Sequence, residues 1–330
     1  MPQPDLLPAF LDDIVAHPEE PSLWLILADW LDEQGDPRAE MIRLHWMAQY
    51  EPGHREWLAR EARIRELLRG GMLPIVPGRS VGGIEFAWIP PGSFAMGSPA
   101  DEDGHSERER QHRVTLTRGY FLGIHLVTQN QWQAVMGSNP SAFSRGGMWH
   151  NDVRNFSDAG VGRFPVDSIS WVLAREFCEK LTERLGRRFD LPTEAQWEWA
   201  CRGGMRSPLP FHFGQVLNGL QANCDGRTPY GGPLTGPYLS RTTMVGSFAP
   251  NIRGLYDLHG NLMEWCRDAY RVDPQKLGEV DPVNDPATAN RRVLRGGCLF
   301  SHGKNCRTAA RHDYTISDRS TFFGLRLVVA

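Results

Sequence analysis

The sequence predicts an α+β protein in which a small all-α domain precedes a larger, irregular and loop-rich mixed domain. Three observations favour this organisation. Apolar residues recur at helical spacing through residues 1–70, and a Pro/Gly-rich linker follows at 71–82. From residue 83 onward, short alternating apolar segments are separated by frequent turns. With 330 residues, the chain is long enough for two domains.

Residues 1–70 are predicted to form four helices. Ser22 is expected to cap the second helix and Gly35 to end it in a left-handed conformation. Asp36 is expected to cap the third helix, and the fourth covers Arg55–Arg69. The segment LWLILADWLDEQGDPRAEMIRLHWMAQ resembles a short helical module that bacterial proteins carry ahead of other domains. We expect this module to pack or dock rather than to catalyse.

The second domain, residues 83–330, is predicted to open with strands. The segment IEFAWIPPGSFAMGS alternates apolar and polar residues and breaks at Pro90-Pro91-Gly92, which predicts a β-hairpin. Helices are predicted over 128–136, over 170–185 and from Thr193 onward, because a Thr or Ser suited to capping begins each of them. Short strands are predicted near residues 292–295 and 324–329. The 34 glycines, 24 prolines and 11 tryptophans favour an irregular fold held by aromatic packing.

Composition argues against nucleic acid and membranes as partners. The net charge of −3 gives no general attraction to either, and no stretch approaches 18 continuous apolar residues. The first residues lack the basic and apolar regions of a secretory signal, so a cytoplasmic location is the default expectation. The six cysteines show no C-x-x-C spacing and are expected to be free, buried thiols.

Eight phrases spread over residues 83–330 follow one another in a recognisable order. They are IPPGSFAMGS, RVTLTRGYFLGIHLVTQNQW, NPSAF, FPVDSISWVLAREFCEKL, RFDLPTEAQWEWACRGG, GLYDLHGNLMEWCRD, RVLRGG and GLRLV. Together they resemble the formylglycine-generating-enzyme, or sulfatase-modifying-factor, domain. The resemblance implies a C-type lectin fold with short strands and two main helices.

The enzymes of this family use two cysteines after the R-G-G motif to bind copper and oxidise a substrate cysteine. Here the segment reads RGGCLFSHGKNCRTAAR, and the match places Ser301 and Cys306 at the two positions. A hydroxyl is a poor ligand for Cu(I), which prefers thiolates. We therefore expect no copper and no catalysis, and the alternative is a copper oxidase that uses Cys306 with Cys298.

A second group in this family, the variable proteins of diversity-generating retroelements, lacks the cysteine pair. In that system reverse transcription at adenines turns AAC codons into NNC, which never encodes Lys, Glu, Gln, Met or Trp. The tail at 298–322 resembles such a variable segment. The residues expected to vary and to bind ligand are Leu299, Phe300, Ser301, His302, Ala310, His312, Asp313, Tyr314, Ile316, Ser317, Ser320, Thr321 and Phe322. None is one of the five excluded types, an outcome that chance gives roughly one time in twenty.

The phrase GLYDLHGNLMEW resembles a calcium loop of the same family. The match implies side-chain oxygens from Asp257 and Glu264 and backbone carbonyl oxygens from Gly260 and Leu262. Hard oxygen ligands of this kind suit Ca²⁺. The sequence therefore predicts a structural calcium ion.

The favoured interpretation is a ligand-binding protein that displays a diversified surface to an unknown, macromolecular ligand, expected to be a protein. Aromatic, Ser and His side chains are good general contact makers, and they belong on a frame that does not depend on them. Two alternatives stay open. One is the copper oxidase, and the other is a non-catalytic signalling or scaffolding protein whose residues 1–70 dock a partner.

Overall fold

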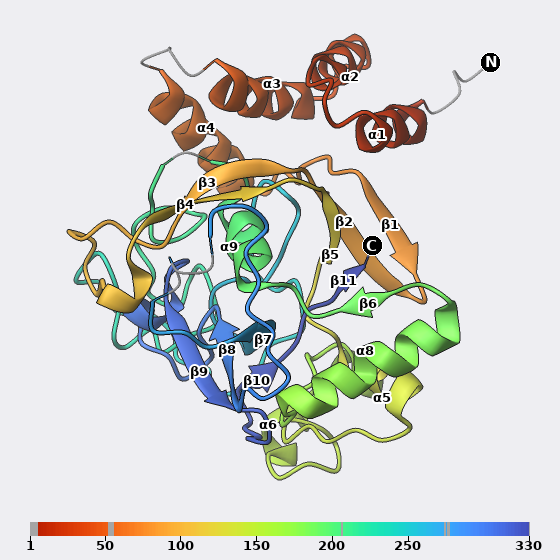
Figure 1. Cartoon of the computed structure of the whole chain (residues 1–330), viewed down its shortest axis with the longest axis vertical. Helices are drawn as coiled ribbons and strands as arrows, with labels where there is room; N and C mark the ends of the chain where they lie inside the picture. Colours follow the sequence, from red (N-terminus) through yellow and green to blue (C-terminus); the bar gives the residue numbers. More distant parts are fainter. Residues whose placement is uncertain (1–5, 52–55, 206, 274, 276–277, 330) are drawn as a thin grey trace.

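The computed structural model describes residues 6–51, 56–205, 207–273, 275 and 278–329, in which a layer of helices lies against a mixed domain (Figure 1). The predicted α+β class is confirmed. Within those ranges, no helix combines the length and apolar character needed to cross a membrane.

The helical module, residues 6–70, contains four helices. They are α1 (Leu7–Ala16), α2 (Ser22–Glu33), α3 (Arg38–Tyr50) and α4 (Trp57–Arg69). Gly35 has φ +69°, as predicted for the end of the second helix. Asp36 accepts a hydrogen bond from the backbone of Arg38 at 2.9 Å and so supports the start of α3. The predicted cap at Ser22 is wrong, because α2 already includes Ser22 and Pro21 precedes it without a side-chain bond. Arg55, the predicted first residue of the fourth helix, lies outside the described residues.

Three sheets organise the mixed domain. The five-stranded sheet has the order β1-β2-β5-β11-β6, the four-stranded sheet β10-β7-β8-β9, and β3 pairs with β4. The strands of the first are β1 (Gly78–Val81), β2 (Ile84–Ile89), β5 (Tyr120–Gly123), β6 (Phe189–Asp190) and β11 (Val328–Val329). Those of the second are β7 (Met263–Ala269), β8 (Arg291–Arg295), β9 (Arg311–Thr315) and β10 (Phe323–Gly324). The last pair is β3 (Gly92–Met96) and β4 (His112–Leu116).

Two predictions about the start of this domain are corrected. The expected hairpin across Pro90-Pro91-Gly92 does not form, because β2 pairs with β1 and β5 while β3 pairs with β4. The expected linker at 71–82 is not entirely unstructured, since β1 occupies its last part and pairs with β2.

Three helices of the mixed domain begin where the sequence predicts them, and they are α5 (Gln129–Met136), α8 (Trp171–Leu185) and α9 (Glu194–Arg202). Two short helices that the sequence analysis did not predict lie between α5 and α8, and they are α6 (His150–Val153) and α7 (Asp158–Gly162). Thr128 and Thr193 form capping boxes with a Gln three residues later, and Ser170 caps α8. Trp132 of α5 stacks on Phe177 of α8 at 5.0 Å, which joins the two helices over the core.

The helical module shares buried surface with the mixed domain. Met41, Ile64 and Leu68 pack in one cluster with Ile252 from the mixed domain. The backbone N–H of Ser207 donates to Glu61 at 3.2 Å, and Arg65 donates to the Ser207 hydroxyl at 3.1 Å. The two parts therefore meet through both apolar and polar contacts.

Candidate functional site: the tail between strands β8 and β11

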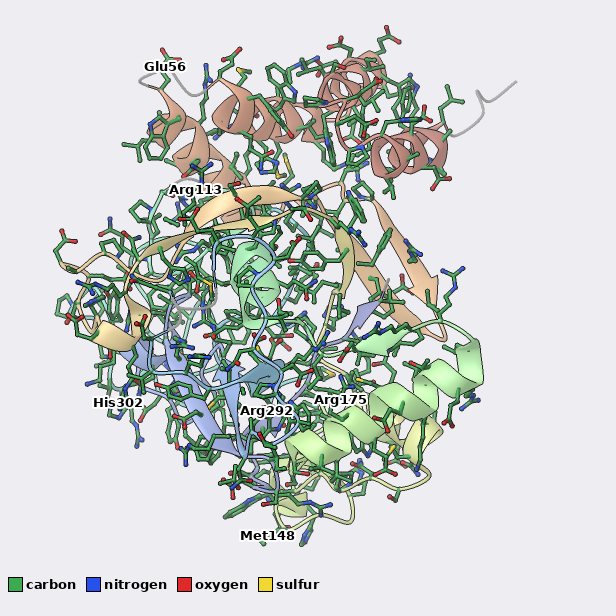
Figure 2. The ribbon with its side chains drawn as sticks, in the orientation of Figure 1. Glu56, Arg113, Met148, Arg175, Arg292 and His302 are labelled. Carbon is green, nitrogen blue, oxygen red and sulfur yellow. The ribbon has the colours of Figure 1, made fainter. Side chains whose placement is uncertain are left out.

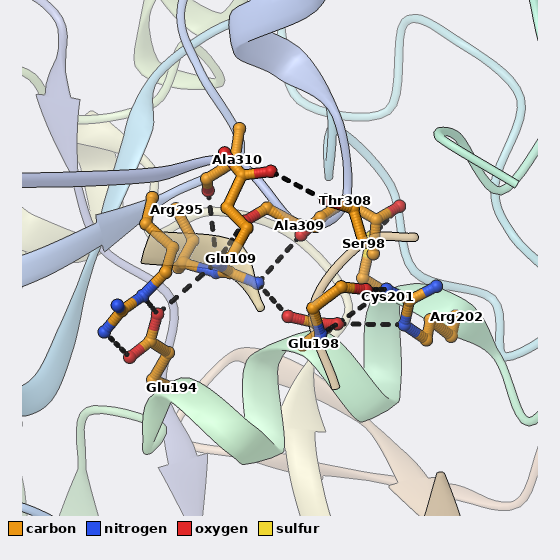
Figure 3. Close-up of polar contacts among 12 residues, drawn as sticks. Ser98, Glu109, Glu194, Glu198, Cys201, Arg202, Arg295, Thr308, Ala309 and Ala310 are labelled. Atoms are coloured by element: carbon orange, nitrogen blue, oxygen red, sulfur yellow. Dashed lines mark hydrogen bonds and ion pairs between the residues drawn. The ribbon is translucent and has the colours of Figure 1, made fainter. Parts of the chain in front are cut away.

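The tail, residues 296–322, is anchored by an arginine at the end of β8. Arg295 is buried, and it donates to the carbonyl oxygens of Thr308, Ala309 and Ala310 at 2.8 to 3.1 Å (Figure 3). The same guanidinium forms ion pairs with Glu198 and Glu194 of α9. Because the Arg295 side chain holds three successive backbone carbonyls, residues 308–310 are fixed to the end of β8.

Two further arginines hold the tail from its other side. Arg307 forms an ion pair with Glu109 at 2.8 Å, and Arg311 at the start of β9 donates to Glu194 at 2.7 Å. The buried Arg307 is thus paired with a carboxylate, as a guanidinium removed from water requires. The loop is therefore tied down by charged groups that point inward, away from its outer face.

The glycines of the R-G-G motif allow the tail to pass close to the interior. Gly297 has φ +70°, and a Cβ there would lie 2.7 Å from the sulfur of Cys306. Only glycine fits a left-handed residue at such a close approach.

Three of the thirteen predicted ligand-binding residues lie inside the molecule. Leu299 is 0% exposed and packs in a core cluster with Leu262. Ser301 is buried and accepts a hydrogen bond from the backbone of Cys298 at 3.0 Å. Ala310 is buried below the Arg295 guanidinium. These three do not present side chains to a ligand. They were predicted from the resemblance and from the residue types that NNC codons encode, and neither contains information about burial.

Three other predicted residues come together on the outside. The rings of Phe300 and Phe322 lie 6.4 Å apart, and Tyr314 lies 6.4 Å from Phe322. Phe300, which is 39% exposed, continues at 6.4 Å to Tyr238, a residue outside the tail. Tyr238, Phe300, Tyr314 and Phe322 form what we call the aromatic patch.

The aromatic patch has a polar border supplied by a second loop. The guanidinium of Arg227 lies 4.0 Å from the Tyr238 ring and is paired with Asp225 at 2.8 Å. The backbone of Asp225 donates to Ser301 at 2.9 Å, which fastens this loop to the tail. His302, two residues after Phe300, is exposed, and Figure 2 shows it at the edge of the mixed domain. Neither Tyr238 nor Arg227 was predicted from the sequence, since their loop has no periodicity or motif.

The remaining predicted residues flank the patch or lie on the other face of β9. Asp313 follows His312 on β9 and points to the opposite face from Tyr314, where it pairs with Arg291. His312 is half-buried and lies 3.2 Å from the carbonyl oxygen of Asn305. The other predicted residues follow β9 and are half-buried or exposed; they are Ile316, Ser317, Ser320 and Thr321.

The predicted calcium residues fit an ion in part. Both carboxylate oxygens of Glu264 are engaged, by Arg326 at 2.9 and 3.0 Å and by the Trp197 indole at 2.9 Å. Asp257 differs, because its Oδ2 accepts from the Gly246 backbone at 2.8 Å while its Oδ1 is buried without a partner. Burial raises the pKa of Asp257 to about 6. Among the implied residues, Asp257 therefore has the free hard oxygen that calcium prefers, and Glu264 serves Arg326.

The thiols of the tail do not reproduce the family's copper pair. Ser301 supplies a hydroxyl at one position, and it lies 3.4 Å from the sulfur of Cys298. Cys306 interacts instead with Cys224, a thiol that the sequence did not single out; hydrogen bonding with Cys306 lowers the pKa of Cys224. All three cysteines are buried. In the described part of the chain, no group of three or more His, Cys, Asp or Glu side chains is arranged to hold a metal.

Comparison with known proteins identifies the scaffold. A family model described as the sulfatase-modifying factor enzyme 1-like domain matches residues 79–330. The chain belongs to this family. The match begins within β1, and the predicted C-type lectin fold of the formylglycine-generating type is confirmed.

Relatives of this sulfatase-modifying-factor domain have different names. The formylglycine-generating enzyme of Streptomyces coelicolor is 34% identical over 282 residues, covering 72% of this chain and 87% of that enzyme. The serine/threonine-protein kinase pkn1 of Chlamydia pneumoniae is 29% identical over 257 residues. That match covers 73% of this chain and only 37% of the kinase.

Solved structures give the same fold. Treponema denticola variable protein 1 is 27% identical with a TM-score of 0.60, over 78% of this chain and 99% of that protein. PvdO from Pseudomonas aeruginosa, at 22% identity and a TM-score of 0.62, covers 78% of this chain and shows the fold alone.

Proposed function

We propose that this chain is a non-catalytic ligand-binding protein that displays a diversified surface on a C-type lectin scaffold. The observation that carries the proposal is the aromatic patch, because its rings are partly exposed and in mutual contact, with Phe300 the most open and Tyr314 and Phe322 resting on the core. The similarity to a variable protein of Treponema denticola over nearly all of that protein's length supports it.

The patch has the chemistry of a general recognition surface. Tyr and Phe rings offer large rigid contact areas with little conformational entropy to lose, and Arg227 with His302 adds polar contacts at the border. A surface of this kind suits a protein ligand better than nucleic acid, since the chain carries a net charge of −3. We therefore propose a protein partner and no role for nucleic acid or membrane.

The gene itself provides the test. We expect a second, near-identical copy of the tail-coding segment beside a reverse transcriptase gene. In it, AAC codons should stand at the ten predicted positions outside the core, while the codons for Arg295, Arg307 and Arg311 should be the same in both copies. Absence of the copy, or differences concentrated at the anchoring arginines, contradicts the proposal.

We also propose a cytoplasmic location. The six cysteines, Cys178, Cys201, Cys224, Cys266, Cys298 and Cys306, are all free and buried. Unpaired thiols in this number suit a reducing compartment.

A second candidate function is copper-dependent oxidation, favoured by the contact between Cys224 and Cys306. Two adjacent thiols are the ligands that Cu(I) prefers. Titration of the reduced chain with Cu(I), repeated on Cys306→Ser and Cys224→Ser, separates the two candidates. If the chain is a non-catalytic binding protein, we expect it to bind no Cu(I) tightly. A tight Cu(I) site that both substitutions remove would favour the oxidase.

A further inference from the structure

Strand β3 is paired with β4 along one edge, and the backbone groups along its other edge point away from the sheet. Thr115 of β4 is bonded on its far side, because its N–H donates to Glu279 at 2.7 Å and its carbonyl oxygen accepts from Asp281 at 2.9 Å. Thr115 lies opposite Ser93 of β3 in the antiparallel ladder. A pair in which one residue directs its backbone groups outward exchanges no hydrogen bonds within the ladder. The N–H and carbonyl groups of Ser93, and by alternation those of Ala95, therefore also point away from β4.

Side chains of α9 bind the backbone at both ends of this edge. Just after β3, the N–H of Gly97 donates to Glu198 at 2.8 Å and its carbonyl oxygen accepts from Arg202 at 2.6 Å. Just before β3, the Pro90 carbonyl oxygen accepts from the Trp199 indole at 2.9 Å. Among the described residues, none bonds to the outward backbone groups of the two residues in the middle. An open length of strand edge is a template for pairing with another strand.

This unpaired edge lies in a groove of about 420 Å³ between the helical module and the mixed domain. Residues 90–95 form one wall, and the other includes Tyr50 of α3, Trp199 and Arg202 of α9, and the segment that follows α9. Figure 1 shows β3 and β4 lying beneath α3 and α4. We call this space the edge groove. Because Ser93 and Ala95 are exposed, an extended chain in the groove can reach their backbone groups.

The two faces of β3 beside the edge groove differ in chemistry. Phe94 points to the face on which its ring lies 5.3 Å from Trp199, so this face is apolar. Ser93 and Ala95 point to the other face, which carries Arg113 opposite Ala95. Arg113 is exposed and forms no ion pair within the described part of the chain, and Figure 2 shows it near the helical module. Because Ala95 has only a methyl group, the Arg113 side chain can reach across it to an added strand.

We propose that the edge groove binds an extended segment of a partner protein, which adds a strand to β3 and has the sequence pattern acidic–apolar–acidic. Ser93 and Ala95 offer two N–H donors and two carbonyl acceptors, and one further strand satisfies all four. The apolar residue of that segment lies on the face of Phe94, and its acidic residues lie on the face of Arg113. The edge groove is separate from the aromatic patch and does not depend on the function proposed for that patch.

The test titrates the full chain with the peptide acetyl-Thr-Glu-Val-Glu-Thr-amide in a calorimeter. One control peptide is N-methylated at both glutamates, which removes the backbone donors that face β3 and keeps every side chain. A second control peptide has lysine in place of both glutamates. We expect a Kd below about 1 mM for the first peptide and at least about tenfold weaker binding of each control. No binding of the first peptide at about 1 mM, or equal binding of either control, overturns the proposal.

Variants assign the binding to β3. Ala95→Pro removes an N–H that points away from β4, so the ladder between β3 and β4 should remain while peptide affinity falls at least about tenfold. Ala95→Ser keeps this N–H, and as the matched control it should bind as the wild type does. Unchanged affinity in Ala95→Pro overturns the proposal.

Two further measurements keep the proposal testable and distinguish another occupant. Arg113→Glu should reverse the preference for glutamate over lysine, which gives a result even if Ala95→Pro does not fold. A preference for glutamate that persists in Arg113→Glu overturns the proposal. Sedimentation of the wild type alone should show no dimer that depends on β3. A dimer that Ala95→Pro abolishes would assign the edge groove to a second copy of the chain and would also overturn it.

Discussion

The inward and outward sides of the tail differ in how their residues are held. On the inward side, Arg295 and Arg307 each have several hydrogen bonds and ion pairs to buried glutamates. On the outward side, Phe300 and Phe322 make ring contacts at 6.4 Å and are partly open to solvent. The charged residues of this loop thus fix the path of its backbone, and its aromatic residues are partly exposed on the outer side.

Removing the inner anchor should have the largest effect. Arg295→Met leaves Glu198 and Glu194 with a lost ion-pair partner in the interior, which we expect to cost about 3–5 kcal/mol of unfolding free energy. Arg291→Met is the matched control, since it breaks only the exposed pair with Asp313 and should cost less than about 1 kcal/mol. Urea unfolding of both variants measures the difference, and similar losses would refute the division between the two sides.

Neighbouring residues of the tail allow a finer comparison. Leu299→Ala should cost about 2–5 kcal/mol, because the side chain is fully buried. Phe300→Ala, one residue later, should cost less than about 1 kcal/mol, because that ring lies at the surface. The same urea titrations decide, and a larger loss for Phe300→Ala than for Leu299→Ala would reverse the assignment of the two faces.

Acid should destabilise the fold in part through the buried His259. Burial lowers the pKa of His259 from 6.5 to about 4. The unfolded chain takes up a proton below pH 6.5 while the folded chain does not, so the stability present above pH 6.5 is lost as the pH falls toward 4. Between pH 7.5 and 5 this amounts to about 2 kcal/mol.

The variant His259→Asn isolates that effect. Asn can still donate to the Cys306 carbonyl oxygen, which accepts from His259 at 2.7 Å, and it does not titrate. Compared with the wild type under the same conditions, the pH dependence of unfolding should be weaker in His259→Asn by the stated amount. An unchanged pH profile in His259→Asn would contradict the prediction.

Calcium should have the smallest effect. If Asp257 Oδ1 is a ligand, a tenfold excess of calcium over its Kd raises the unfolding free energy by about 1.4 kcal/mol. We expect this rise in the wild type and not in Asp257→Asn, which keeps the bond from Gly246 and tolerates φ +58°. Thermal unfolding with calcium and with a chelator measures it. Equal shifts in both proteins would place the ion elsewhere.

Sequence reasoning predicted interactions between residues close together in the chain and missed those between distant residues. Thr128 and Ser170 cap their helices through residues three positions away, so the motif alone predicts them. The pair between Arg295 and Glu198 joins residues 97 positions apart, and the contact between Cys224 and Cys306 crosses loops without periodicity. Three of the four residues of the aromatic patch, Phe300, Tyr314 and Phe322, were among the residues predicted from the tail, whereas the position of Tyr238 depends on how a distant loop folds back.

The position of β11 has a consequence for errors in the gene. Val328 and Val329 pair with β5 on one side and with β6 on the other, so the five-stranded sheet is completed by residues that follow the tail. An insertion or deletion that shifts the reading frame within the tail replaces this central strand as well. Such a product would lack the bridge between β5 and β6 and could not fold, while a substitution that keeps the frame leaves it intact. Chains with a frameshift in the tail would therefore be lost as unfolded products, whereas chains with substitutions in the tail would keep β11.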